Sequence, residues 1–439
     1  MKKKILSLVA LVAMTLSFGQ SWTQQNSGIP LADGGVRDFS IVDANTAWIT
    51  FYDGSNQTYP RYVANTTNGG TTWTAKLVSS LPSSALISDI HAFDNNNAYI
   101  VSAPASGTTA NGLWKTSDAG SSWTKVSGIF NNSSFGNIIY FWNNSEGIVI
   151  GDPVGSKYEM YKTTDGGTTW NTLSTAPSPV NGDEYGYVGG KVSYGDHLWL
   201  TSNTGRILHT ADKGLTWNSY IAPIDDFAGE NSSGAMSFSS ENYGLIVDNT
   251  GWLWVTEDGG SNWELKDAQG YYTADIKYIP GSANTFVSTG LNVYESEYGS
   301  AYSNDGGKTW VNIDFGVTLA DARINTSALD CNTIYTSNFA TSTGQGGILK
   351  LNGTIPGCTL AVNDQTLTKV ELKAVVNNGI LNIVTNKDVK DILVGDMSAK
   401  TLASSTTKFV NVSQLKSGVY FARVAYVDGS NSTIKFVIK

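Results

Sequence analysis

Among the carboxylates outside the repeated octapeptide of this chain, those that could reach the open face of the fold are the candidates for acid–base chemistry, and they include Asp38, Asp89, Asp152, Asp183, Glu184 and Asp275. Hydrolysis of a glycosidic bond needs two carboxylates that face each other across a cleft. The candidates in this sequence are scattered, and no partner for any of them can be read from spacing. We therefore assign no catalytic residue.

The sequence gives little indication of metal, nucleotide or nucleic-acid binding. The three histidines, His91, His197 and His209, show no metal-ligand spacing, and no phosphate-binding loop or nucleotide motif is present. The formal net charge of −9 argues against a nucleic-acid surface, because such a surface needs a concentrated basic stripe. We expect no metal, no cofactor and no nucleic-acid partner.

The strongest signal is an octapeptide that recurs six times, beginning at Thr66, Thr116, Thr163, Thr210, Thr256 and Ser303. Each copy ends in a tryptophan, and successive tryptophans lie 50, 47, 47, 46 and 47 residues apart. Self-similarity at such a period is typical of repeat folds. The composition agrees, since 46 glycines, 13 tryptophans and 21 tyrosines suit many short strands joined by tight turns.

The octapeptide has the chemistry of a hairpin turn. Its third residue can accept hydrogen bonds from backbone N–H groups of the turn, its Ser or Thr hydroxyl can brace the turn, and its Gly supplies a positive φ. The tryptophan then buries a large ring against the neighbouring sheet. The pattern resembles the Asp-box, or bacterial neuraminidase repeat, and we interpret these residues as structural: Asn68, Asp118, Asp165, Asp212, Asp258, Asp305, Trp73, Trp123, Trp170, Trp217, Trp263 and Trp310.

Each repeat holds four short strands, which is one blade of a β-propeller. Six complete blades are predicted between residues 35 and 315. Residues 321–353 supply three more strands, and Ser21-Trp22-Thr23 has the register of the strand that follows each octapeptide. We therefore predict an all-β, seven-bladed propeller that is closed by its N-terminal strand.

Propeller ligands usually bind at the mouth of the central funnel, where loops from all blades converge. Arg37, Lys191 and Arg323 occur at comparable points, at the start of innermost strands. We predict a ligand-binding set at the funnel mouth that consists of Arg37, Asp38, Asp89, Asp152, Lys191, Asp275 and Arg323. The alternative is that these charges only solvate the pore.

Export is indicated at the N-terminus. Lys2, Lys3 and Lys4 precede an apolar run from Ile5 to Leu16, and Ser17-Phe18-Gly19 offers a cleavage site, so residues 1–19 are predicted to be a signal peptide. No later segment is long and apolar enough for a transmembrane helix. In an oxidising compartment we expect Cys331 and Cys358 to form a disulfide, although two free buried thiols are the alternative.

The repeats stop after Cys358, and the remaining residues contain no tryptophan. Leu415-Lys416-Ser417-Gly418-Val419-Tyr420-Phe421 and the closing Thr433–Lys439 resemble the type A C-terminal sorting domain of the type IX secretion system of Bacteroidetes, with Gly418, Tyr420 and Lys435 as motif residues. The Pro-rich start common in that family is missing. The resemblance implies an immunoglobulin-like β-sandwich that engages the secretion machinery and sends the protein to the cell surface or the medium. The expected organisation is signal peptide 1–19, propeller 20–357 and sorting domain 358–439.

The function predicted from these features is an extracellular module that binds a glycan or a protein. Together with the repeats, Gly151-Asp152-Pro153 resembles propellers similar to photosystem II assembly factors, which implies a protein-binding scaffold. The alternative is a glycoside hydrolase or polysaccharide lyase acting at the funnel, since xyloglucan-cleaving hydrolases also carry Asp-boxes, although on two tandem propellers. A sialidase is disfavoured, because it needs an arginine triad and only four arginines precede residue 360.

Overall fold

The computed structural model describes residues 20–54, 59–105, 110–130, 134–229, 231–358, 372–385, 387–396, 400–427 and 431–438. The chain divides into two compact units, residues 1–361 and 362–439. The predicted signal peptide, residues 1–19, lies outside the described residues.

The first unit is built from four-stranded antiparallel sheets, and seven of them lie within its described residues. The first three sheets consist of β2 (Gly34–Ile41), β3 (Ala47–Asp53), β4 (Tyr62–Thr66) and β5 (Thr74–Leu77); β6 (Ala85–Ala92), β7 (Ala98–Pro104), β8 (Gly112–Thr116) and β9 (Thr124–Val126); and β10 (Gly136–Phe141), β11 (Gly147–Val154), β12 (Lys157–Thr163) and β13 (Asn171–Thr172). The next three consist of β14 (Gly186–Tyr194), β15 (His197–Ser202), β16 (Arg206–Thr210) and β17 (Asn218–Ile221); β18 (Gly234–Phe238), β19 (Gly244–Asp248), β20 (Leu253–Thr256) and β21 (Glu264–Lys266); and β22 (Asp275–Tyr278), β23 (Phe286–Asn292), β24 (Glu297–Ser303) and β25 (Val311–Val317).

The seventh sheet joins the two ends of the unit. After a short 3₁₀ turn, η1 (Leu319–Asp321), its strands are β26 (Thr326–Asp330), β27 (Thr333–Ser342), β28 (Gln345–Asn352) and β1 (Ser21–Asn26). β1 pairs antiparallel with β28, and Trp22 lies opposite Leu351. The N-terminal strand thus covers an edge that would otherwise be open.

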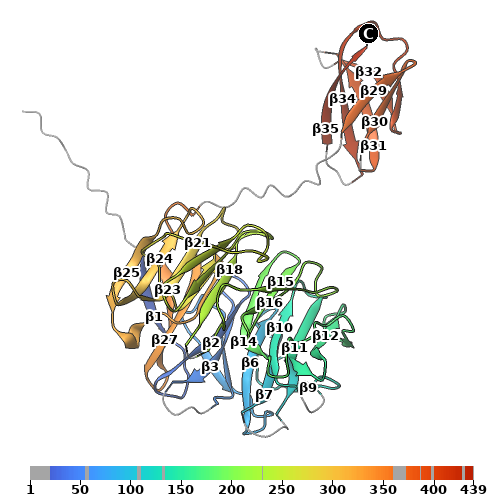
Figure 1. Ribbon diagram of the computed structural model, residues 1–439. Coiled ribbons are helices and arrows are strands. Elements are labelled where there is room, and N and C mark those ends of the chain that lie inside the picture. Colours follow the sequence, from blue (N-terminus) through green and yellow to red (C-terminus); the bar gives the residue numbers. More distant parts are fainter. Residues whose placement is uncertain are drawn as a thin grey trace, which may run out of the picture. The chain divides into compact units, whose positions relative to one another are not determined.

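The sheets follow one another around a centre. Each first strand contacts the first strand of the next sheet, from β2 through β6, β10, β14, β18 and β22 to β26, and β26 contacts β2. In Figure 1 these innermost strands lie toward the middle of the unit, while outer strands such as β9 and β25 lie at its rim. Residues 20–358 therefore fold as a β-propeller.

The octapeptide turns have the hydrogen bonds that their sequence predicts. In the second copy the Gly120 N–H donates to Thr116 Oγ1 at 3.0 Å, and the Ser122 N–H donates to Asp118 Oδ1 at 2.9 Å. The same two bonds recur in the other five copies. The carboxylates of the octapeptides are thus engaged in hydrogen bonds within their own turns.

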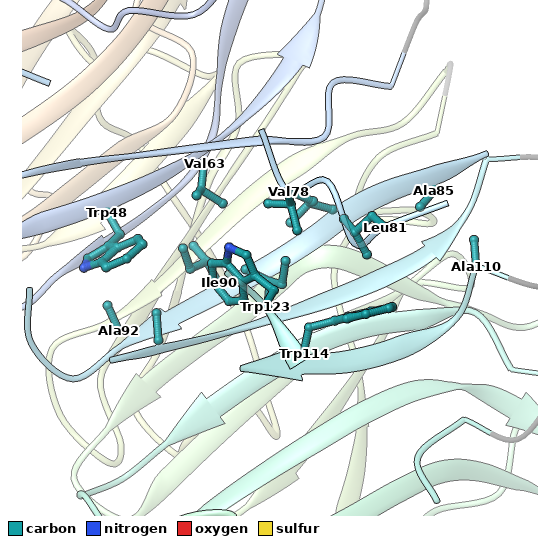
Figure 2. Close-up of a cluster of buried hydrophobic side chains, with 13 residues drawn as sticks. Trp48, Val63, Val78, Leu81, Ala85, Ile90, Ala92, Ala110, Trp114 and Trp123 are labelled. Carbon is teal, nitrogen blue, oxygen red and sulfur yellow. The ribbon is translucent and has the colours of Figure 1, made fainter. Parts of the chain in front are cut away.

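The tryptophan of each octapeptide packs across a sheet boundary, as Figure 2 shows for the cluster between the first two sheets. The ring of Trp123 meets that of Trp48 edge-on, with centroids 6.4 Å apart. Trp73 packs in the same way on Tyr335 of the seventh sheet, at 6.0 Å. These rings join each sheet to the one before it and make the wall of the propeller a continuous core.

The second unit is a β-sandwich. One sheet contains β29 (Lys373–Asn377), β30 (Ile380–Val384) and β33 (Phe409–Asn411), and the other contains β32 (Thr401–Ser405), β31 (Val389–Gly395), β34 (Gly418–Tyr426) and β35 (Asn431–Ile438). Leu381, Ile392 and Val424 are fully buried between the sheets. No described helix in either unit has the length and apolar character needed to cross a bilayer.

Candidate functional site

The candidate site is a cavity of about 400 Å³ at the centre of the propeller. It is lined by residues from the N-terminal ends to the middle of the innermost strands, including Arg37 and Asp38 of β2 and Asp275 and Lys277 of β22. Because the strands alternate in direction, the N-terminal ends of the innermost strands share one face with the loops that join second to third strands and fourth strands to the next sheet. We call this the cavity face.

Strand β14 forms one side of the cavity. Its pairing with β15 is interrupted between Gly186 and Lys191, and the intervening residues bulge inward. Tyr187, Gly190 and Lys191 all line the cavity, and the strand is half-exposed along nearly its whole length. A β-bulge changes the direction in which side chains point, and such bulges are frequent beside functional sites.

Lys191 brings together carboxylates from two other sheets. Its Nζ lies 3.5 Å from Asp38 Oδ2 and forms a closer ion pair with Asp89 Oδ1. Asp89 is fully buried, whereas about a quarter of the Asp38 side chain is exposed. A single cation therefore balances two acids that belong to β2 and β6.

The pKa values of this trio follow from burial and mutual attraction. Burial opposes ionisation of Asp38, but the Lys191 ammonium and a hydrogen bond with Asp89 bring the pKa of Asp38 below its ordinary value. Burial raises the pKa of Asp89 well above its ordinary value, against the opposing effect of Lys191. Burial alone would lower the pKa of Lys191, yet the two carboxylates raise it. The lysine therefore remains charged and ties the sheets together.

Two carboxylates at the centre of the propeller, Asp89 behind the cavity and Asp275 in its lining, also connect neighbouring sheets through the backbone. Asp89 accepts the N–H of Ile90 through one oxygen and that of Ile139, in the next sheet, through the other, both at 2.8 Å. Asp275 accepts the N–H groups of Ile276 and of Thr326, in the next sheet, at 2.9 and 2.7 Å. With both oxygens engaged, neither acid is placed to exchange protons freely with a substrate.

Arg37 differs from the other cavity charges. It is the bulged residue of β2, since the register shifts between Val36 and Asp38. Its Nε is buried without a hydrogen-bond partner, and none of the ion pairs among the described residues includes it. Burial lowers its pKa, an effect opposed by Tyr52, Asp38 and Tyr59. Lys277, by contrast, lies 3.5 Å from Asp275.

Of the predicted funnel residues, Arg37, Asp38, Lys191 and Asp275 line the cavity, and Asp89 contacts it through Lys191. Arg323 does not line it, because its guanidinium pairs with Asp314 of β25 at 2.5 Å. Whether any of these residues binds a ligand stays a prediction.

Asp152 also lies outside the cavity lining. Its Oδ1 accepts hydrogen bonds from the Asn137 side chain and the Gly186 N–H at 2.7 and 2.9 Å. Burial raises the pKa of Asp152 to about 6, against these two bonds. Of the other two acids, Glu184 pairs with Arg206 at 2.6 Å and Asp183 is exposed.

Lys277 and Tyr187 line the cavity but were not predicted from the sequence. Lys277 has a readable signal, because it lies two residues after Asp275 on a strand and so faces the same side. Tyr187 has none, since the bulge that turns it inward is set by the pairing of β14 with β15.

The sorting motif lies on two paired strands of the second unit. Tyr420 of β34 faces Phe436 of β35, and Phe421 faces Lys435. The Tyr420 hydroxyl donates to the Lys416 carbonyl at 2.8 Å, and Gly418 begins the strand. Residues 377–439 match the secretion system C-terminal sorting domain family. This tail is the signal of type IX secretion, so the protein is exported to the cell surface or secreted.

The propeller is similar to several known proteins at low identity. It superimposes on YCF48 bound to D1 peptide with a TM-score of 0.53 and 16% identity, covering 77% of this chain and 97% of that one. YCF48 from Cyanidioschyzon merolae gives a TM-score of 0.50 and 14% identity, covering 76% and 98%. These likenesses support the propeller fold.

A curated xyloglucanase from Paenibacillus sp is 23% identical over 262 residues. The matched region is 49% of this chain, and the chain spans 24% of that relative's length.

Proposed function

We propose that this protein is an exported binding module whose propeller holds a glycan at the central cavity. The observation that carries the proposal is the engagement of the cavity acids. Asp89 and Asp275 each accept two backbone N–H groups, and Asp38 is paired with Lys191. The described cavity thus offers fixed charges and hydrogen-bonding groups but no free pair of carboxylates. Such an arrangement suits binding better than hydrolysis.

Glycans are the favoured ligand class for two reasons. The cavity volume of about 400 Å³ falls in the range of small-ligand sites. The partial similarity to a xyloglucanase supports a carbohydrate over a peptide, although that relative is matched over a quarter of its length.

A glycoside hydrolase is the second candidate, and Asp152 is the residue that favours it. A carboxyl with a pKa of about 6 is suited to act as a general acid near neutral pH. Its Oδ1 is engaged, and a hydrolase would need a second carboxylate within about 10 Å of it.

One experiment separates the two candidates. The purified full chain is incubated with a panel of plant, algal and host polysaccharides, and both retention in affinity electrophoresis and release of reducing sugar are measured. We expect that at least one polysaccharide retains the protein in affinity electrophoresis and that no reducing sugar is released. Sugar release that is lost in Asp152→Asn would establish the hydrolase instead, and failure to retain any polysaccharide would contradict the binding module.

A further inference from the structure

The cavity charges balance one another with one exception. Lys191 is paired with Asp38 and Asp89, and Lys277 lies near Asp275. Arg37, at the edge of the same cavity, has no ion-pair or hydrogen-bond partner among the described residues. A half-buried guanidinium that no protein acceptor engages is available to pair with an anionic group of a ligand.

The group beside Arg37 is also unpaired. Tyr52 is close enough to affect the pKa of Arg37, and its hydroxyl is buried without a hydrogen-bond partner. Tyr59, also close to Arg37, is 45% exposed. Arg37 is therefore bordered by phenol groups, and although Asp38 attracts it electrostatically, no described carboxylate forms an ion pair with it.

Most exposed aromatic rings of the described propeller lie in loops of the cavity face. Among the described propeller residues, six aromatic side chains are exposed, and four of them lie in loops of this face: Tyr59, Tyr185, Trp252 and Tyr294. Flat aromatic rings at a surface are suited to stacking on apolar faces of ligands, and polar groups at their edges can bind hydroxyls.

Trp252 is held on a rigid turn. Asp248 Oδ1 accepts the N–H groups of Thr250 and Trp252 at 2.9 and 3.0 Å. The Gly251 carbonyl accepts the Tyr294 hydroxyl at 2.8 Å, which joins the two aromatic loops. Any Cβ at Gly251 would lie 2.2 Å from a methyl group of Val293, so only glycine permits this approach. The backbone that carries Trp252 and the ring of Tyr294 are thus held in place before a ligand arrives, which lowers the entropy lost on binding.

The aromatic loops are connected to the cavity. Tyr185 packs edge-on against Tyr187, which lines the cavity, with centroids 5.5 Å apart. The Asn249 N–H, three residues before Trp252, donates to the Ser233 carbonyl at 2.9 Å, and the next residue, Gly234, lines the cavity.

From these contacts we infer that the ligand is an acidic glycan, whose uronate carboxylate pairs with Arg37 while its sugar rings stack on Trp252 and the neighbouring tyrosines. This inference rests on the proposed glycan-binding function and names its ligand class. A carboxylate matches the planar fork of a guanidinium and can form two parallel hydrogen bonds with it. A lysine at position 37 would supply the charge without that geometry.

The test uses polygalacturonate and its fully methyl-esterified form, which differ in the charge of the carboxyl group. Isothermal titration of the full chain should show binding of the acid form and at least 10-fold weaker binding of the ester. Arg37→Gln should weaken binding of the acid form about 10- to 100-fold, and Arg37→Lys should recover only part of that loss. Trp252→Ala should weaken binding of both forms about 3- to 10-fold.

Matched controls are available on the opposite face. Lys308→Gln removes the same charge from the sixth octapeptide, and Tyr194→Ala removes an exposed ring between β14 and β15; neither should alter binding. Thermal unfolding of every variant checks that it is folded. If Arg37→Gln does not fold, increasing salt should still weaken binding of the acid form and leave the ester unchanged.

The outcomes distinguish this inference from the proposed function. Equal binding of acid and ester, or a preference for a neutral polysaccharide that Arg37→Gln leaves unchanged, would overturn the acidic ligand and keep the glycan-binding function. Binding of dextran sulfate but not polygalacturonate would overturn the carboxylate. Binding of poly-glutamate in place of every polysaccharide would overturn both.

Discussion

The ammonium group of Lys191 lies 3.5 Å from a carboxylate oxygen of Asp38, a residue 153 positions earlier in the chain. One lies on β14 and the other on β2, two strands that belong to different sheets. Together with Asp89 of β6 they make a charged bridge across the centre of the propeller. The bridge defines the polarity of the cavity and helps to hold the sheets in their ring.

Removal of the lysine should therefore destabilise the propeller. Lys191→Met leaves two neighbouring carboxylates without a counter-charge, and we expect the free energy of unfolding to fall by about 3 kcal/mol at pH 8. The pKa of Asp89, already raised by burial, would rise further, and a raised pKa gives stability at low pH that is lost as pH rises. The loss should thus be smaller at pH 5 than at pH 8. Urea unfolding at both values measures it, with Lys308→Met as the control; an equal loss at both would show that the charge bridge is not its cause.

The raised pKa of Asp152 leads to a second prediction, which is that the stability of the fold depends on pH. Because its pKa is raised to about 6 in the folded chain, its contribution to stability is present below pH 4 and is lost as pH rises through 6. Asp152→Asn keeps an acceptor for Asn137 and Gly186 but removes the charge. We expect this variant to be more stable than the wild type by up to about 2 kcal/mol at pH 8, and equal to it near pH 4. Melting curves across this range are the measurement, and a variant that is less stable at every pH would contradict the raised pKa.

The backbone of the octapeptide turns indicates a substitution that should stabilise the fold. Ala119 has a φ of 58°, in the left-handed region where four of the other five copies have glycine. Ala119→Gly should raise the free energy of unfolding by up to about 1 kcal/mol, because a side chain is strained there. Gly120→Ala is the matched control: its φ is 79° and a Cβ would lie 3.2 Å from the Trp48 ring, so it should destabilise. Chemical unfolding of the two variants should give opposite signs.

The disulfide between Cys331 and Cys358 predicts sensitivity to reduction. It spans 27 residues and fixes the end of the propeller chain to the seventh sheet. Reduction, or Cys331→Ser, should lower the free energy of unfolding by about 3 kcal/mol. The variant itself should then be insensitive to reductant, which unfolding with and without dithiothreitol would show. A reductant effect that persists in the variant would assign the loss to something else.

Much of the fold could be read from the sequence because the repeat is local. The six octapeptides place a turn and a tryptophan at fixed positions, and the hydrogen bonds at Thr116 and Asp118 are those that the residue types predict. The predicted disulfide is present, and the sorting tail is identified by its closing motif.

The site could be predicted only in part, because its contacts are long-range. Arg37, Asp38, Lys191 and Asp275, which were predicted to lie at the funnel mouth, line the central cavity, and whether they bind a ligand stays a prediction. Sequence alone could not show that Lys191 joins Asp38 to Asp89, or that Arg323 is held by Asp314, because these pairs depend on how different sheets meet. The unpaired state of Arg37 is likewise a property of the assembled ring.

The pairing of β1 with β28 has a consequence for biogenesis. The Asn26 side chain accepts the N–H of Gly346, 320 positions later, so the first described strand of the propeller can pair only after the last one, β28, has been made. Contacts at such separation form slowly, and until they form the ring has two unpaired edges. A chain cut short anywhere before β28 would keep both edges open and be exposed to proteases and aggregation. Ring closure therefore distinguishes complete from truncated propellers, because only a chain that includes β28 can pair its first strand and cover both edges.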